Sequence, residues 1–177
     1  MNKKIIFVAV SFLWIAVAVG LIISKQHIIR TGKTVLLETV PVDPRDFLRG
    51  EYVILRYKIS SVDLQQIQSE KSYYGRGERV YVRLEPRERL WEATAVRIQK
   101  PVSDNGVYIK AKVKYCYNKK LELTYGIESY FVPEGEGKDI ENNMRGNSSS
   151  VEVEVLVDTS GNAIIKKLLA QYEKHIH

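Results

Sequence analysis

An uninterrupted apolar run near the N-terminus constrains this chain most strongly. Residues 5–23 (IIFVAVSFLWIAVAVGLII) are 19 consecutive positions without a charged side chain. A helix rises about 1.5 Å per residue, so this run is long enough to cross a hydrocarbon core of roughly 30 Å. No other segment of the 177 residues has this property. We therefore expect residues 1–30 to hold a short cytoplasmic N-terminus, one transmembrane helix and a juxtamembrane connector, and residues 31–177 to form a separate domain.

A cleaved signal peptide is the alternative interpretation of the same run. Residues 16–18 (Ala-Val-Ala) offer a small-x-small cleavage site, but the apolar run continues through residues 21–23, which favours a retained signal-anchor. Basic residues flank both ends, so the positive-inside rule does not decide the orientation. A short N-terminus before a large C-terminal domain favours a single-pass protein with its domain on the extracytoplasmic side.

The net charge of +6 arises mostly beside the apolar run. Four of the 27 Lys and Arg residues and none of the 21 acidic residues precede residue 31, which leaves a net charge of +2 on residues 31–177. Basic residues are expected next to a membrane-spanning helix. The domain itself is close to neutral, and we expect no nucleic-acid partner.

Short segments of alternating polarity follow from residue 34 onward. They predict about eight strands, one minor helix over residues 60–67 and a final hairpin. The expected strands cover residues 34–40, 51–59, 78–84, 90–98, 107–117, 121–132, 151–157 and 163–169. Residues 31–177 are therefore predicted to form a mainly β domain, arranged as a β-barrel or as two sheets.

The strand over residues 107–117 has the clearest alternation. One predicted face carries Val107, Ile109, Ala111, Val113, Tyr115 and Tyr117, and the other carries Tyr108, Lys110, Lys112, Lys114 and Cys116. The three lysines form a basic face that either contacts anionic polymers or lipids, or keeps an exposed sheet face or edge soluble. Solubility is the simpler interpretation. Cys116, the single cysteine, is expected to be buried as a small apolar side chain.

The sequence lacks the residue arrangements that are typical of catalytic and metal-binding sites. The three histidines are His27, beside the apolar run, and His175 and His177, near the C-terminus, so no Ser-His-Asp or Cys-His arrangement is indicated. Zinc-ligand spacing, a phosphate-binding loop and a dinucleotide fingerprint are absent from the sequence. The acidic segment 134–141 does not have calcium-loop spacing. We expect no catalytic residue, no metal and no cofactor.

The segment Gly50-Glu51-Tyr52-Val53-Ile54-Leu55-Arg56-Tyr57 resembles the signature of the GDYXXLXY family of bacterial membrane-anchored proteins. Glu51 stands where the signature has Asp, and every other defined position matches. The preceding residues 41–50 and a second block, residues 125–137 (YGIESYFVPEGEG), are also similar to the family. The resemblance implies a protein of the bacterial inner membrane, and it implies no activity or catalytic residue.

We expect the two blocks to contact one another. Glu51 is predicted to accept hydrogen bonds from backbone amides or from Arg45 or Arg49, and so to hold the loop 41–50. Tyr125, Tyr130 and Phe131 are predicted to pack against this loop, because buried aromatic residues pack and their hydroxyls need partners. The candidate binding or structural residues are Arg45, Asp46, Arg49, Gly50, Glu51, Tyr52, Leu55, Tyr57, Tyr125, Gly126, Glu128, Tyr130, Phe131, Pro133, Glu134, Gly135 and Gly137.

Three functions stay open at this stage. The favoured one is a non-enzymatic binding or accessory protein that acts on another envelope or membrane protein. The second is a sensor or binder of anionic envelope polymer or lipid through Lys110, Lys112 and Lys114. The third is an unconventional carboxylate-dependent hydrolase, because the turn before the strand is similar to the one after the nucleophile of type I signal peptidases. Val42-Asp43-Pro44-Arg45 lacks the serine that this comparison requires.

Overall fold

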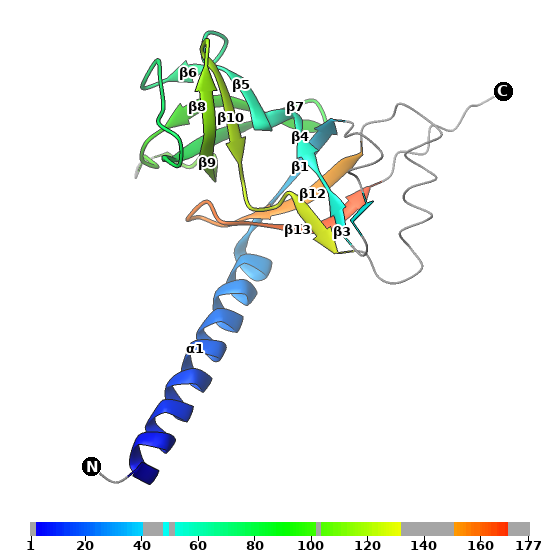
Figure 1. Ribbon diagram of the computed structural model, residues 1–177. Helices are drawn as coiled ribbons and strands as arrows, with labels where there is room; N and C mark the ends of the chain where they lie inside the picture. Colours follow the sequence, from blue (N-terminus) through cyan, green and yellow to red (C-terminus); the bar gives the residue numbers. More distant parts are fainter. Residues whose placement is uncertain (1–2, 41–47, 50–51, 102–103, 132–150, 170–177) are drawn as a thin grey trace, which may run out of the picture.

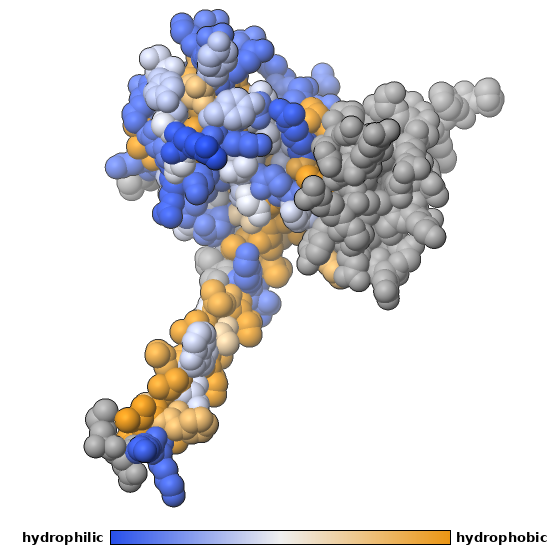
Figure 2. All heavy atoms as spheres, in the orientation of Figure 1, coloured by the Kyte–Doolittle hydropathy of each residue, from blue (hydrophilic) through white to orange (hydrophobic). Residues whose placement is uncertain are grey.

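The structure is a computed structural model that describes residues 3–40, 48–49, 52–101, 104–131 and 151–169. Among these residues there is one α-helix, α1 (Lys3–Thr31), which has 29 residues and projects from the β domain (Figure 1). The helix is long and apolar enough to cross a membrane, and a signal sequence would meet the same criteria. Figure 2 shows apolar side chains along most of this helix and polar ones over most of the domain surface. The helix also continues through the expected connector and ends next to the first strand.

The β domain contains three hydrogen-bonded sheets. The four-stranded sheet has the order β13-β12-β1-β4, the six-stranded sheet β5-β10-β9-β7-β8-β6, and the three-stranded sheet β11-β3-β2. The strands are β1 (Lys33–Val40), β2 (Leu48–Arg49), β3 (Tyr52–Ile54), β4 (Arg56–Tyr57), β5 (Ser61–Asp63), β6 (Gln68–Ser69), β7 (Arg79–Arg87), β8 (Leu90–Arg97), β9 (Val107–Tyr117), β10 (Lys120–Thr124), β11 (Ser129–Phe131), β12 (Glu152–Val157) and β13 (Ala163–Leu169). The predicted mainly β fold is confirmed. Within the described residues the sheets do not close into a barrel, and one hydrophobic core joins side chains from all three.

The strand predicted over residues 51–59 is divided at Leu55. β3 pairs with β11, β4 pairs with β1, and a 3₁₀ turn, η1 (Lys58–Ser60), follows. The predicted alternation nevertheless holds from Val53 to Ile59, since every second side chain is buried. One strand therefore contributes to two sheets and ties them together at its midpoint.

The helix predicted over residues 60–67 is wrong. Ser61–Asp63 forms β5 and pairs antiparallel with β10, and the amide of Leu64 donates to the carbonyl of Lys119 at 2.9 Å. The spacing of Leu64 and Ile67 favoured a helix locally. Pairing with a strand some 60 residues away in the chain outweighs that local preference.

The alternation predicted for residues 107–117 holds only as far as Val113, and even there Tyr108 is buried although it lies on the face expected to be exposed. Glu122 pairs with Tyr115 and Leu123 with Val113, so Lys114 has no partner on β10 and forms a bulge. Beyond this bulge Tyr115 and Tyr117 are exposed. Cys116 was expected to be buried, but it is only partly buried and packs against the edge of the core.

The turn between β12 and β13 fastens the four-stranded sheet to β9. Asp158 accepts hydrogen bonds from the amides of Ser160 and Asn162, both at 2.8 Å, and Gly161 adopts a positive φ of 87°. The carbonyl of Gly161 then accepts from the amide of Lys110 at 2.8 Å. A side chain at Gly161 would approach the carbonyl of Tyr108 to 3.0 Å, so this contact requires glycine.

Candidate functional site

The signature strand and the second block lie side by side. Residues 129–131 of β11 pair with residues 52–54 of β3, and the amide of Leu55 donates to the carbonyl of Glu128 at 2.7 Å. Contact between the two blocks therefore occurs through a backbone ladder as well as through side chains. The part of the prediction that involves the loop 41–47 lies outside the described residues.

Two tyrosines cross between these blocks in opposite directions. The Tyr57 hydroxyl donates to the Ile127 carbonyl at 2.7 Å, and the Tyr125 hydroxyl donates to the Ile59 carbonyl at 2.6 Å. Both tyrosines are buried members of the core. Burial raises the pKa of each hydroxyl well above its ordinary value, and the Glu128 carboxylate adds to both shifts. These hydroxyls are therefore held neutral as hydrogen-bond donors.

Glu128 holds the turn that presents the second block. Its carboxylate accepts hydrogen bonds from the amide of Tyr125 and, at 2.9 Å, from the amide of Gly126. Gly126 has a positive φ of 79°, a conformation that glycine adopts without strain. Both oxygens of Glu128 thus bind backbone, and the residue acts in the turn.

The remaining predicted residues divide into two groups. In the first group, Leu55 is buried, Tyr130 packs partly against the core and Phe131 is 53% exposed. Arg49 and Tyr52 also belong to it and are cross-strand partners in β2 and β3. The others lie outside the described residues: Arg45, Asp46, Gly50, Glu51, Pro133, Glu134, Gly135 and Gly137. The predicted role of Glu51 stays a prediction.

A groove of about 310 Å³ opens directly after the signature strand. One side is formed by η1, β5 and the turn after them, and the other by the end of the β7–β8 hairpin. Its apolar lining consists of Ile59, Val62, Ile67, Leu90, Trp91 and Ala93. The groove therefore lies between the two ends of the six-stranded sheet, where a closed barrel would have a further strand.

Charged side chains along the groove neutralise one another. Lys58 bonds to Glu38 at 2.9 Å and lies 4.0 Å from Glu92, and Arg87 bonds to Glu92 at 2.9 Å. The Glu38 carboxylate raises the pKa of the Lys58 ammonium group. An occupant of the groove would meet an apolar surface bordered by paired charges.

The groove also exposes strand edges. β5 is the last strand at one end of its sheet, and β6 pairs with β8 only at Ala95 and Val96. Residues 90–94 of β8 therefore pair with a hydrogen-bonded strand on the β7 side alone among the described residues. β1 also lies near β8 and places the Lys33 ammonium 5.2 Å from the centre of the Trp91 ring. The hydroxyls of Ser60 and Thr94, next to the groove-lining residues, are buried without a hydrogen bond to any described residue.

Sequence reasoning missed this groove. Trp91 and Ala93 were assigned only to a strand, and Ile67 to a helix that does not form. The useful signal was a half-buried tryptophan near a hairpin end, and its place in the groove becomes apparent only when the strand order is known. A group of three or more His, Cys, Asp or Glu side chains suited to a metal is not found among the described residues.

Comparison with known proteins gives one match. The family described as GDYXXLXY protein matches residues 14–168, and thus takes in the second half of α1 and all three sheets. Curated proteins and solved structures give no significant match.

Proposed function

The chain belongs to the GDYXXLXY family, and we propose that it is a membrane-held, non-enzymatic accessory protein that binds an extended segment of another protein in the groove. The bound segment adds a strand to the open edge of β8. In this proposal α1 spans the inner membrane of a bacterial cell and the β domain lies on the extracytoplasmic side. The groove between the two sheet ends is the observation that carries the proposal.

Three properties of the groove support a strand-forming occupant. An exposed strand edge offers backbone amides and carbonyls in the order that a further strand requires. The apolar lining suits side chains that recur at every second position of that strand. The charged side chains at its border are paired with one another, Lys58 with Glu38 and Arg87 with Glu92, so they leave the apolar lining available.

The two blocks hold η1, which forms part of one side of the groove. Ile59 lines the groove, and its carbonyl accepts the hydrogen bond from Tyr125. Lys58 at its border follows Tyr57 directly in the chain. Tyr57 and Tyr125 of the two blocks thus position η1, and we propose that this is how the blocks contribute to binding.

Peptide selection tests the proposal. A displayed library of unstructured peptides is selected against the full-length protein in nanodiscs, and we expect enrichment of peptides with apolar residues at every second position. Ala93→Leu narrows the groove and should weaken the selected peptides at least tenfold. Ala163→Leu makes the same change in β13 and serves as the control. Equal affinities for the two variants, both folded by circular dichroism, would show that the groove is not the binding site.

Orientation is tested separately. Protease added to spheroplasts that express the full-length protein should remove the β domain if this domain is extracytoplasmic. Protection in spheroplasts, with cleavage only after lysis, would place the domain on the other side of the membrane.

A further inference from the structure

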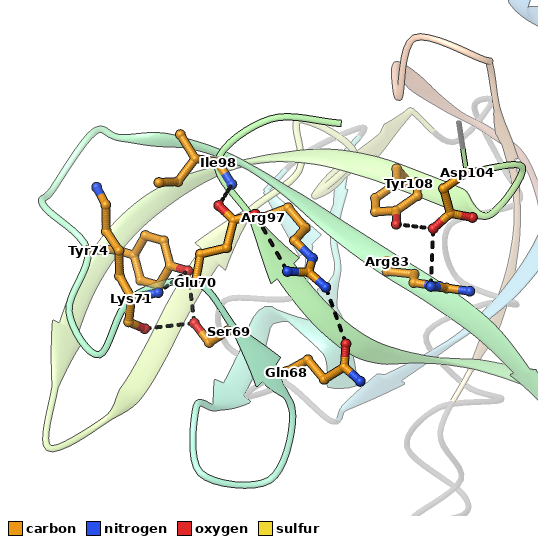
Figure 3. A network of polar contacts seen from close by, with 10 residues as sticks. All are labelled: Gln68, Ser69, Glu70, Lys71, Tyr74, Arg83, Arg97, Ile98, Asp104 and Tyr108. Atoms are coloured by element: carbon orange, nitrogen blue, oxygen red, sulfur yellow. Dashed lines mark hydrogen bonds and ion pairs between the residues drawn. The ribbon is translucent and has the colours of Figure 1, made fainter. Parts of the chain in front are cut away.

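The basic residues of the β domain fall into two groups, paired and unpaired. Figure 3 shows two paired arginines on the six-stranded sheet. Arg83 lies 3.1 Å from Asp104, and Arg97 lies 3.6 Å from Glu70. Hydrogen bonds from Tyr108 and from the amide of Gly106 lower the pKa of Asp104, which keeps this carboxylate charged. Arg56, Lys58, Lys71, Arg87, Arg89, Lys166 and Lys167 also have acidic partners.

Most of the basic residues without an acidic partner gather around the far half of β9, while Lys33, Lys100 and Lys110 lie elsewhere and contact the Trp91 ring, the Thr159 carbonyl and Asn162. Six exposed basic residues there make no ion pair with any described residue, and we name them the basic stripe: Arg76, Arg79, Lys112, Lys114, Lys119 and Lys120. Two nearby acids are already bound: Glu78 by Lys71 at 2.6 Å and by the amide of Gly75 at 2.9 Å, and Glu122 by Arg56 at 3.2 Å. A third, Asp63, lies opposite Lys120 across the strand pair and accepts a hydrogen bond from the amide of Gln65. The stripe therefore carries charge that the protein itself does not neutralise.

Two members of the basic stripe oppose one another directly. Arg79 of β7 and Lys112 of β9 are cross-strand partners, so their side chains leave the same face of the sheet as neighbours. Like charges at such positions destabilise a sheet. β9 lies between β7 and β10, so these lysines do not protect a sheet edge. Lys112 and Lys114 are exposed, and the expectation that such lysines keep a sheet face soluble still applies to them. An anion bound between the two side chains would relieve their repulsion.

The direction of β9 places the basic stripe far from α1, which favours an extended ligand over a membrane surface. Val107, at its first residue, lines the same hollow as Thr31 at the end of α1. β9 then runs for 11 residues, which is roughly 35 Å at 3.4 Å per residue. Lys120 follows and pairs with Asp63 of β5, which lies at the end of the domain away from α1 (Figure 1). Lipid charges are screened within about 8 Å at physiological ionic strength, so they would not reach this end.

We propose that the basic stripe binds an extended polyanion, a chain molecule with closely spaced phosphate or carboxylate groups. Lys112 and Lys114 lie two residues apart, which places their backbones roughly 7 Å apart along the strand. Arg79 broadens the site across β7. This site is separate from the groove, so it does not depend on the function proposed above.

A binding measurement tests this proposal. The full-length protein in nanodiscs of uncharged-headgroup or zwitterionic lipid is titrated with labelled long-chain inorganic polyphosphate and, in a second arm, with labelled polyglutamate. Binding is expected in at least one arm, and the arm that binds identifies the anionic group. Lys112→Gln/Lys114→Gln should weaken binding roughly 30-fold, on the basis of about 1 kcal/mol for each lysine at an anionic surface.

A matched control makes the result decisive. Lys166→Gln/Lys167→Gln removes the same charges from β13, and binding should stay within about twofold of the unchanged protein. The slope of log affinity against log salt should fall by roughly 1.4 for the stripe variant alone, by analogy with single-stranded nucleic acid. Equal losses in the two variants would overturn the proposal. So would the absence of binding in both arms.

Discussion

Tyr57 and Tyr125 form reciprocal hydrogen bonds that connect the signature strand with the second block. The buried Tyr57 hydroxyl donates to the carbonyl of Ile127, two residues after Tyr125, and the buried Tyr125 hydroxyl donates to the carbonyl of Ile59, two residues after Tyr57. These two hydrogen bonds, which we call the clasp, join β4, η1 and the turn after β10. Because the clasp lies directly behind the groove, it connects the signature to the proposed binding surface.

Removal of either hydroxyl should destabilise the domain. Tyr57→Phe or Tyr125→Phe leaves a buried carbonyl without its donor, so we expect the free energy of unfolding to fall by about 1–3 kcal/mol for each variant. Denaturant unfolding of the full-length protein measures this change. Tyr117→Phe is the control, since Tyr117 is 73% exposed and should have no effect. Equal stabilities for all three variants would show that the clasp contributes nothing.

The same tyrosines should make stability sensitive to alkaline pH. The pKa of both hydroxyls is raised in the folded protein by burial and by Glu128, while the unfolded chain keeps a value near 10. The unfolded state therefore releases protons first as the pH rises, and the stabilising contribution, fully present below pH 10, is lost above it. Tyr57→Phe should show a shallower decline between pH 10 and 11.5 than the unchanged protein. Parallel declines would contradict the assignment.

Glu128 should contribute to the stability of the folded domain. Glutamine has one carboxamide oxygen where Glu128 uses two oxygens to bind the amides of Tyr125 and Gly126, so Glu128→Gln should lower stability by about 1–3 kcal/mol. Glu88→Gln is a suitable control because Glu88 is exposed at the β7–β8 turn. Unchanged stability with lost hydrolytic activity in Glu128→Gln would instead favour the carboxylate-dependent hydrolase.

The sequence predicted local patterns better than long-range pairing. The apolar run, the mainly β domain and the final hairpin followed from composition and periodicity, and the family followed from the signature. The bulge at Lys114 did not, because it depends on which residue of β10 faces which residue of β9. The groove was missed for the same reason. Residues of β5 and β8 line it together only because of the order of strands in the sheet, which the sequence does not state.

The basic stripe should cost stability in the absence of a ligand. Lys112→Glu places opposite charges on the cross-strand pair with Arg79, and we expect the free energy of unfolding to rise by about 0.2–1 kcal/mol at low salt. At 1 M salt the Debye length shrinks to about 3 Å and the gain should largely disappear. A loss of stability at low salt would show that the two cations do not repel one another significantly.

Strand addition is tested most directly by backbone methylation of a selected peptide. Two versions keep identical side chains and carry N-methyl groups at alternate residues, one set on each edge of the extended peptide. Methylation of the edge that faces β8 removes donors for the ladder, so affinity for the full-length protein in nanodiscs should fall at least 30-fold, whereas methylation of the other edge should change it less than threefold. Equal affinities for the two methylated peptides would contradict strand addition in the groove.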